Sequence, residues 1–176
     1  MLVEIADEDA RWALLNLETL AARACGAVLD HLGHAPSLFE VSLLACDDAR
    51  IRTLNAEFRG KDKPTNVLSW PAWDLSADEP GQHPEAPDPG TADDPEFLGD
   101  IALAFETCMA EAKTQQKRPE DHVFHLIVHA TLHLLGFDHE NDMDAVLMEG
   151  IEIAILGKVG IANPYDGDGA DVTALD

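Results

Sequence analysis

Hydrophobic and polar residues follow two distinct patterns along the first third of the chain. Residues 3–5 alternate apolar, charged and apolar, which predicts a short strand. Residues 9–32 repeat apolar side chains at helical spacing and predict one long amphipathic helix. Residues 41–45 form a compact apolar run, typical of a strand, and residues 47–58 then predict an amphipathic helix with an aspartate as its cap.

The rest of the chain continues this mixture of strands and helices. The predicted elements are strands at 67–70 and 101–104 and helices at 106–116, from 119 onward and at 142–156. Pro119 and the two acids after it suit the first turn of a helix. Elements in this order predict an α+β domain, in which a small mixed β-sheet of about four strands packs with about five or six helices.

The run HATLHLLGFDH, residues 129–139, has the spacing of a metal site. His129 and His133 are four residues apart, so both rings can lie on one face of a helix and reach one ion. Gly136 can adopt the left-handed conformation that ends a helix, and the turn then brings in His139 as a third ligand. Three imidazoles with a fourth position left for water describe a catalytic Zn²⁺ site, with one ion per chain, rather than a closed structural site.

The spacing matches the zinc-protease pattern H-E-x-x-H-x-x-G-x-x-H at every position except one. Ala130 stands where that pattern has the glutamate that deprotonates the attacking water. Because a methyl group cannot accept a proton, this zincin-like helix indicates a metal-assisted reaction of another kind. Asp138 is a candidate proton acceptor or outer partner of the site, whereas His122 and His125 are interpreted as core or surface histidines.

The formal net charge of −23 would argue against nucleic acid as a partner, but the acids are unevenly distributed. Residues 71–97 hold eight acids, six prolines and no lysine or arginine, so we expect a mobile, solvated insert there. Residues 163–176 add four aspartates and are expected to form a disordered acidic tail. Residues 1–162 are then predicted to form a single metal-dependent hydrolase domain, for which an apolar content of 46% supplies a core.

The basic residues are clustered. Five of the eleven lie between Arg50 and Lys63. Among them, Arg59 lies at the end of a predicted helix, and Lys61 and Lys63 lie in the loop that follows. From charge alone, an anion-binding surface and an ordinary solvated loop are equally compatible with this cluster. The planar guanidinium of Arg59 could clamp a phosphate in two places, but the residues alone favour a surface salt bridge over this role.

Targeting and redox features favour a cytoplasmic protein. The acidic N-terminus has no basic lead-in of a secretion signal, and no apolar run approaches the roughly 20 residues of a membrane span. Cys25, Cys46 and Cys108 are odd in number and lie in apolar segments. They are therefore expected to be buried thiols in a reducing compartment rather than a disulfide framework.

Several stretches, in this order, resemble the YbeY family of bacterial endoribonucleases and rRNA maturation factors. They are LNAEFRGKDKPTNVLSWP at 54–71, LGDIALA at 98–104, HATLHLLGFDHE at 129–140 and MEGIEIAILGKVG at 148–160. The resemblance implies a small mixed sheet with surrounding helices, the three histidines of the 129–139 run as zinc ligands, and Arg59 in the active-site cleft. The insert 71–97 is longer and more acidic than is typical of the family. Its place near the cleft in sequence would allow it to gate or repel RNA, and an inert loop is the favoured alternative.

By this resemblance we expect a single-strand-specific, zinc-dependent endoribonuclease in rRNA maturation and ribosome quality control. Its partners would be rRNA and the small ribosomal subunit, with neither DNA nor membrane involved. Either water or the 2′-hydroxyl of the RNA can be the attacking group. Two alternatives stay open: a non-catalytic ribosome assembly factor whose zinc is structural, and a metallopeptidase, against which Ala130 counts.

Overall fold

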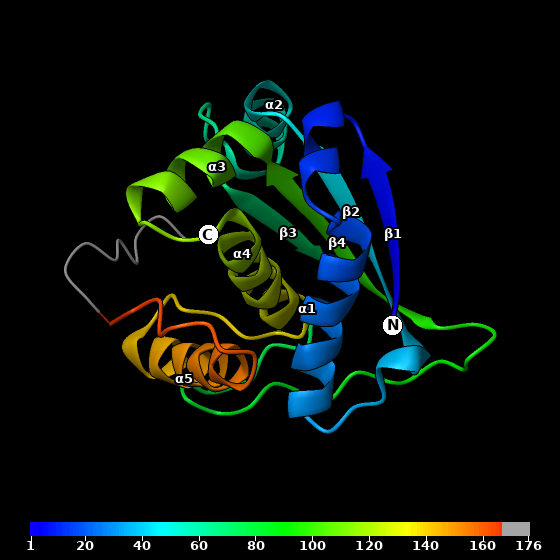
Figure 1. The fold of residues 1–176 in the computed structure, drawn as a ribbon. Coiled ribbons are helices and arrows are strands. Elements are labelled where there is room, and N and C mark those ends of the chain that lie inside the picture. The colour runs from blue at the N-terminus through cyan, green and yellow to red at the C-terminus, as the bar shows by residue number, and fades with distance from the viewer. Residues whose placement is uncertain (167–176) are drawn as a thin grey trace.

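The computed structural model describes residues 1–166, which form one four-stranded sheet and its surrounding helices (Figure 1). The strands are β1 (Leu2–Asp7), β2 (Phe39–Cys46), β3 (Val67–Pro71) and β4 (Glu96–Ala104). Their order across the sheet is β1-β2-β4-β3; β1 and β4 each pair with β2 in parallel, and β3 pairs with β4 antiparallel. The sheet is therefore mixed, and β3, the antiparallel strand, forms one of its edges.

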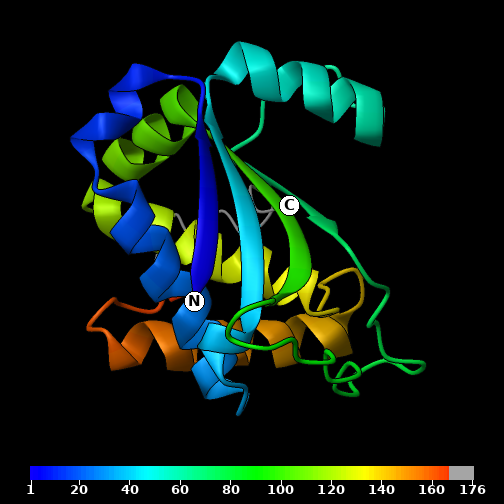
Figure 2. The same ribbon diagram turned by 90° about the vertical axis from the view of Figure 1, so that its right-hand side faces the viewer.

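The helices lie on both faces of this sheet. They are α1 (Leu17–His31), α2 (Asp48–Arg59), α3 (Phe105–Thr114), α4 (Pro119–Leu134) and α5 (Asp142–Lys158), with 3₁₀ helices η1 (Ala10–Leu14) and η2 (Pro36–Leu38). Figure 2 shows α1, α3 and α4 on one side of the sheet and α2 on the other, with α5 packed outside α4. The predicted α+β fold with a small mixed sheet is confirmed.

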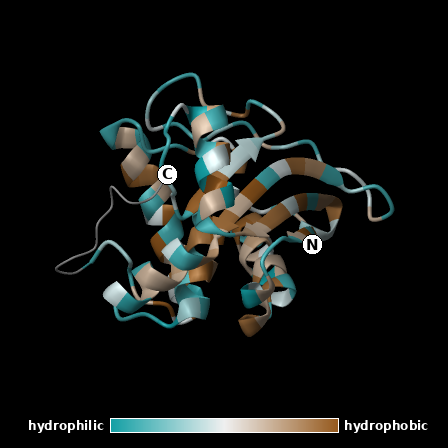
Figure 3. Ribbon diagram, turned by 90° about the horizontal axis from the view of Figure 1, so that it is seen from above, coloured by the Kyte–Doolittle hydropathy of each residue, from teal (hydrophilic) through white to brown (hydrophobic). Residues whose placement is uncertain are grey.

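Side chains of the central strands alternate between two apolar clusters, one on each face of the sheet. On β2, Val41, Leu43 and Ala45 join the large cluster with α1 and α4, whereas Leu44 and Cys46 belong with the small cluster under α2. This alternation follows from the period of two along a strand. In Figure 3 the hydrophobic segments gather along the strands and where the helices meet them.

The single long helix predicted for residues 9–32 is wrong, because the chain forms η1 and α1 with a break at Leu15. Leu15 is extended, with φ −110° and ψ 142°. Both Leu15 and Leu17 are buried, and residues two apart on a continuous helix point to nearly opposite faces. The break lets both enter the core, where Trp12 also packs and donates from Nε1 to the carbonyl oxygen of Cys46 at 2.9 Å.

The acidic insert forms an irregular segment between the end of β3 and Glu96, where β4 begins. Backbone N–H groups tie it to the rest of the chain: Gly81 donates to the carboxylate of Asp144 at 2.7 Å, and Gly90 to the carbonyl oxygen of Leu38 at 3.2 Å. These contacts are sparse, and its mobility stays a prediction. The acidic tail predicted for 163–176 lies, from residue 167 onward, outside the described residues.

Two further features concern the cysteines and the helices. Cys25, Cys46 and Cys108 are buried, free thiols, as predicted. Within residues 1–166, no helix combines the length and apolar character needed to cross a lipid bilayer.

Candidate metal centre and its cleft

His129 and His133 project from neighbouring turns of α4, as their spacing predicts. The helix begins with Pro119 in its first turn and is buried along most of its length, so its position is held by packing on several sides. The two ring centroids are 4.6 Å apart, and the two Nε2 atoms approach to 3.0 Å. A long buried helix therefore gives both imidazoles a rigid support.

Gly136 turns the chain back after α4 so that His139 reaches the same point. Its φ is +95°, in the left-handed region predicted for it. An added Cβ would lie 2.7 Å from the carbonyl carbon of Leu75, so the position also lets the acidic insert approach the turn closely. The His139 ring lies 5.2 Å from that of His129 and 5.1 Å from that of His133.

The structure brings together one ligand nitrogen from each of these histidines, within 4.8 Å of one another. Nδ1 of His133 donates to the carbonyl oxygen of Phe137 at 2.9 Å, and a carbonyl can only accept. Nδ1 of His129 lies 2.6 Å from a carboxylate oxygen of Glu152. With the protons held on Nδ1, the Nε2 atoms of His129 and His133 present lone pairs to the same point. Nε2 of His139 is buried and has no hydrogen-bond partner among residues 1–166. This donor set fits a metal ion.

Glu152 of α5 is a fully buried carboxylate that connects several polar groups behind the histidines. Its second oxygen lies 3.0 Å from Nε2 of His125 and also accepts from the hydroxyl of Tyr165. Burial alone would raise the pKa of Glu152, but the neighbouring His129 and His125 outweigh it, and the pKa is well below its usual range. The carboxylate is therefore ionised at neutral pH, which keeps the proton on Nδ1 of His129.

Glu152 and Tyr165 were not predicted from the sequence. A signal for Glu152 was present, because it is four residues after Met148 and three before Ile155, on the apolar stripe of its helix. A glutamate on such a stripe needs a buried partner. Tyr165 carried no such signal, since it lies in the predicted acidic tail.

The two other histidines of α4 are core residues, in agreement with their interpretation from sequence. His122 is buried and lies 3.1 Å from a carboxylate oxygen of Glu111. His125 is buried against Glu152, and burial lowers its pKa in spite of that carboxylate. Neither belongs to the metal-binding group among the described residues.

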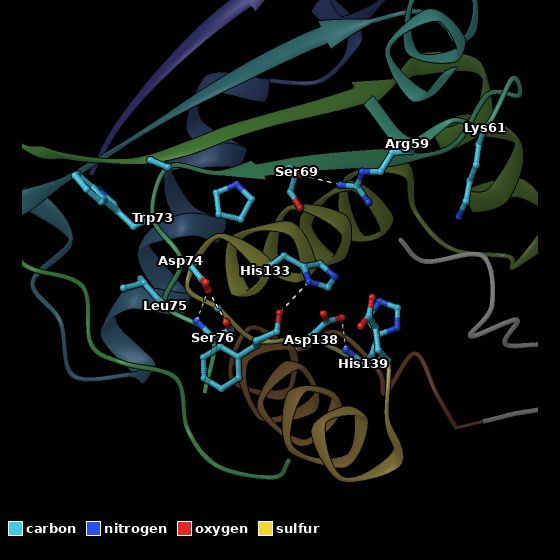
Figure 4. A pocket seen from close by; sticks show the side chains of 15 residues that line it. Arg59, Lys61, Ser69, Trp73, Asp74, Leu75, Ser76, His133, Asp138 and His139 are labelled. Carbon is cyan, nitrogen blue, oxygen red and sulfur yellow. Dashed lines mark hydrogen bonds between the residues drawn. The ribbon is translucent and has the colours of Figure 1, made fainter. Parts of the chain in front are cut away.

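His133 and His139 line a cleft of about 690 Å³ between the edge strand β3 and the turn that follows α4, and His129 is buried behind them (Figure 4). Arg59 and Lys61 line it from the end of α2 and the loop beyond. Figure 4 shows Trp73 and Asp74, from the start of the acidic insert, on the opposite side of His133 from Lys61. The cleft thus has one end with Arg59 and Lys61 and another with an aromatic ring and a carboxylate, and Asp138 and Glu140 line it beside His139.

The side chain of Arg59 is hydrogen-bonded to the edge strand β3. Asp47 caps α2 by accepting from the backbone N–H of Arg50, and Gly60 ends the helix in the left-handed conformation, with φ +68°. Nη2 of Arg59 donates to the carbonyl oxygen of Ser69 on β3 at 2.9 Å. In contrast to Arg50 and Arg52, which pair with carboxylates, Arg59 makes no ion pair among residues 1–166.

Of the remaining residues considered from the sequence, Asp138 lines the cleft, whereas Lys63 and Ala130 do not. Asp138 is half-buried, lines the cleft, and accepts from the backbone N–H of His139 at 2.7 Å. Lys63 is not among the residues that line the cleft, although Lys61 is. Ala130, at the position of the protease glutamate, is buried at 1% exposure and does not line the cleft either.

Fold and site together define an α+β protein with a cluster of three histidines that could hold a metal ion, beside an open cleft. The chain belongs to the YbeY family, because the sequence model described as Endoribonuclease YbeY matches residues 3–160. A relative from Dinoroseobacter shibae, named Endoribonuclease YbeY, is 61% identical over 164 residues, which cover 93% of this chain and 90% of the relative. Another of that name, from Ruegeria pomeroyi, is 57% identical and covers 94% of this chain and 98% of its own length. The predicted family is thereby confirmed.

A solved structure supports the fold alone. The solution structure of a Thermotoga maritima protein superposes with a TM-score of 0.52, covering 90% of this chain and 91% of the other, at 20% sequence identity. The arrangement of sheet and helices is therefore shared at low sequence similarity.

Proposed function

We propose that the protein is a zinc-dependent endoribonuclease that cuts single-stranded RNA in the cytoplasm during rRNA maturation and ribosome quality control. The observation that carries the proposal is a three-histidine centre that shares its cleft with Arg59, in a chain of the YbeY family. The relatives named above are called endoribonucleases, which supports the reaction class. The rRNA substrate and the small ribosomal subunit as partner follow from the family resemblance of the sequence.

Arg59 is proposed to hold the phosphate group that is cut. Its bond to Ser69 fixes the side chain but uses only one of the five N–H donors of a guanidinium, so the others can bind two phosphate oxygens. Negative charge grows on these oxygens in the transition state, and a preorganised cation stabilises it. Lys61 would attract the RNA backbone inside the cleft, and Lys63 would do so beyond it.

The three histidines are proposed to bind zinc, for which neutral imidazoles are preferred ligands. When bound, zinc supplies a Lewis acid that polarises a phosphoryl oxygen. The protein prepares the ligands for this role, because Glu152 and the carbonyl of Phe137 keep protons on the Nδ1 atoms of His129 and His133.

Asp138 is the proposed proton acceptor. The bond from the N–H of His139 occupies Oδ1 and holds the carboxylate at the cleft. Oδ2 can then take the proton of the attacking hydroxyl, whether this belongs to water or to the ribose.

The test compares zinc-loaded, chelator-treated and zinc-restored protein on single-stranded RNA, duplex RNA and DNA of one sequence. We expect cleavage of the single-stranded RNA only, lost with the metal and restored by it. Cyclic phosphate ends, and resistance of RNA with a 2′-deoxy residue at the cut, would identify the 2′-hydroxyl as the attacking group; linear ends would identify water. Failure of protein with one zinc per chain to cut any RNA would contradict the proposal.

A further inference from the structure

Trp73 is a large aromatic residue that remains exposed at the edge of the metal cleft. Its relative exposure is 57%, although it lines the same cleft as Arg59 and His133. Its Nε1 donates to the carboxylate of Glu96, at the start of β4, at 2.9 Å. This bond fixes one edge of the indole to the sheet and leaves a ring face available, which lowers the entropy lost when a planar ligand stacks on it.

We propose that Trp73 and Asp74 form a nucleobase-binding subsite that holds a base next to the scissile phosphate. The inference rests on the proposed endoribonuclease function and specifies how that site recognises RNA. Stacking on an aromatic side chain is the usual way in which proteins hold an unpaired base, because every base has a π-face.

The charges along the cleft determine which part of the nucleotide lies at this end. Arg59 and Lys61 stand at the end that attracts phosphate, and Figure 4 shows Trp73 and Asp74 away from them. Hydrogen bonds from the hydroxyl and backbone N–H of Ser76 lower the pKa of Asp74, so its carboxylate is ionised at neutral pH. A carboxylate repels phosphate but accepts hydrogen bonds from a base.

Asp74 also predicts which bases are preferred. Both hydrogen bonds from Ser76 go to Oδ1, which leaves Oδ2 as an acceptor. Cytosine, adenine and guanine carry an exocyclic amino group that can donate to it, whereas the only comparable donor of uracil, N3–H, lies between two carbonyl oxygens that repel a carboxylate. Since the indole N–H is already bonded to Glu96, Trp73 supplies stacking and Asp74 supplies the discrimination.

The test is an abasic scan of a single-stranded oligoribonucleotide, with kcat/KM measured for zinc-loaded wild type, Trp73→Ala and Asp74→Asn. In wild type, loss of the base at one position beside the cut should lower kcat/KM about 5- to 150-fold, the range for one stacked base. Trp73→Ala should lower it similarly on intact RNA and abolish sensitivity to that abasic position. Asp74→Asn should reduce the penalty for uracil there.

Phe58→Ala is the matched control, because Phe58 is 59% exposed but lines a groove on the other face of the sheet. It should leave kcat/KM and the abasic profile unchanged, with melting temperature and zinc content measured for every variant. Provided that the wild type cuts RNA, the subsite is refuted if Trp73→Ala keeps the abasic profile of the wild type. It is also refuted if Trp73→Ala still loses kcat/KM on the abasic RNA, so that the two losses multiply, or if Phe58→Ala gives the same result as Trp73→Ala. Absence of cutting by the wild type would overturn the endoribonuclease function itself, together with the subsite.

Discussion

At the scale of single residues, Gly136 links the end of α4, the third histidine and the acidic insert. Its positive φ turns the chain toward His139, and the absence of a Cβ lets the backbone at Leu75 lie against it. One backbone position therefore shapes both the metal centre and one wall of the cleft.

Replacing Gly136 by alanine is expected to destabilise the protein by at least about 1–2 kcal/mol, because a left-handed conformation costs that much for a residue with a Cβ. The clash with Leu75 should add to this and weaken zinc binding through His139. Chemical denaturation and zinc competition measure the two effects. Gly150→Ala is the control: it lies inside α5 with open space around its Cβ position, and should stabilise by about 0.5–1 kcal/mol. Equal stability of the two variants would refute this role of Gly136.

Residue roles were predictable from the sequence where local geometry determines them. The spacing of His129 and His133 and the turn at Gly136 follow from helix periodicity and from the conformational freedom of glycine. The burial of Glu152 against His129 could not be predicted in the same way, because it depends on how α5 packs on α4. For Arg59, the residues alone favoured a surface salt bridge over a phosphate clamp, whereas the fold places it in the cleft with no acidic partner among residues 1–166.

At the scale of elements, α5 supplies the carboxylate that orients a ligand carried by α4. Glu152 is fully buried between His125 and His129, and Tyr165, from the segment after α5, donates to the same carboxylate. The packing of these two helices is thereby coupled to the metal centre.

Glu152→Gln should lower zinc affinity about 10- to 100-fold, the usual effect of losing the carboxylate behind a metal-bound histidine. A neutral amide is a weaker acceptor for Nδ1 of His129. Competition with a zinc-binding dye measures the affinity. Glu149→Gln serves as control, since it removes the same charge from the same helix and has no hydrogen bond to a ligand histidine among residues 1–166. An equal loss in both variants would show that charge, and not the bond, is responsible.

Elements with strong periodicity or a clear cap were predicted well, as α2 and its Asp47 cap illustrate. The break between η1 and α1 was missed, because the apolar spacing over 9–32 looks continuous and only the core shows that Leu15 and Leu17 must both be buried. Here tertiary packing overrides the local pattern.

At the scale of the whole molecule, apolar clusters pack on both faces of the sheet, and we expect them to keep the chain folded without metal. Zinc at about 100 times its dissociation constant should add about 2.7 kcal/mol, which corresponds to a rise in melting temperature of about 5–10 °C for a chain of this size. Chelation should reverse the rise and leave a cooperative transition, and His133→Ala should melt near the chelated protein. Loss of cooperative unfolding in either case would instead favour a structural zinc, as in a non-catalytic assembly factor.

The most direct test of the central claim is RNA cleavage by Arg59→Glu beside Arg52→Glu, with zinc content and melting temperature matched to wild type. Both residues belong to α2 and the charge change is identical, but Arg52 pairs with Asp62 on the surface, whereas Arg59 lines the cleft. We predict that Arg59→Glu retains one zinc per chain and loses about 100- to 1,000-fold in kcat, as when a preorganised donor is removed. Arg52→Glu should cut RNA at close to the wild-type rate. Equal cleavage by the two variants would contradict an active site built from the histidine centre and Arg59.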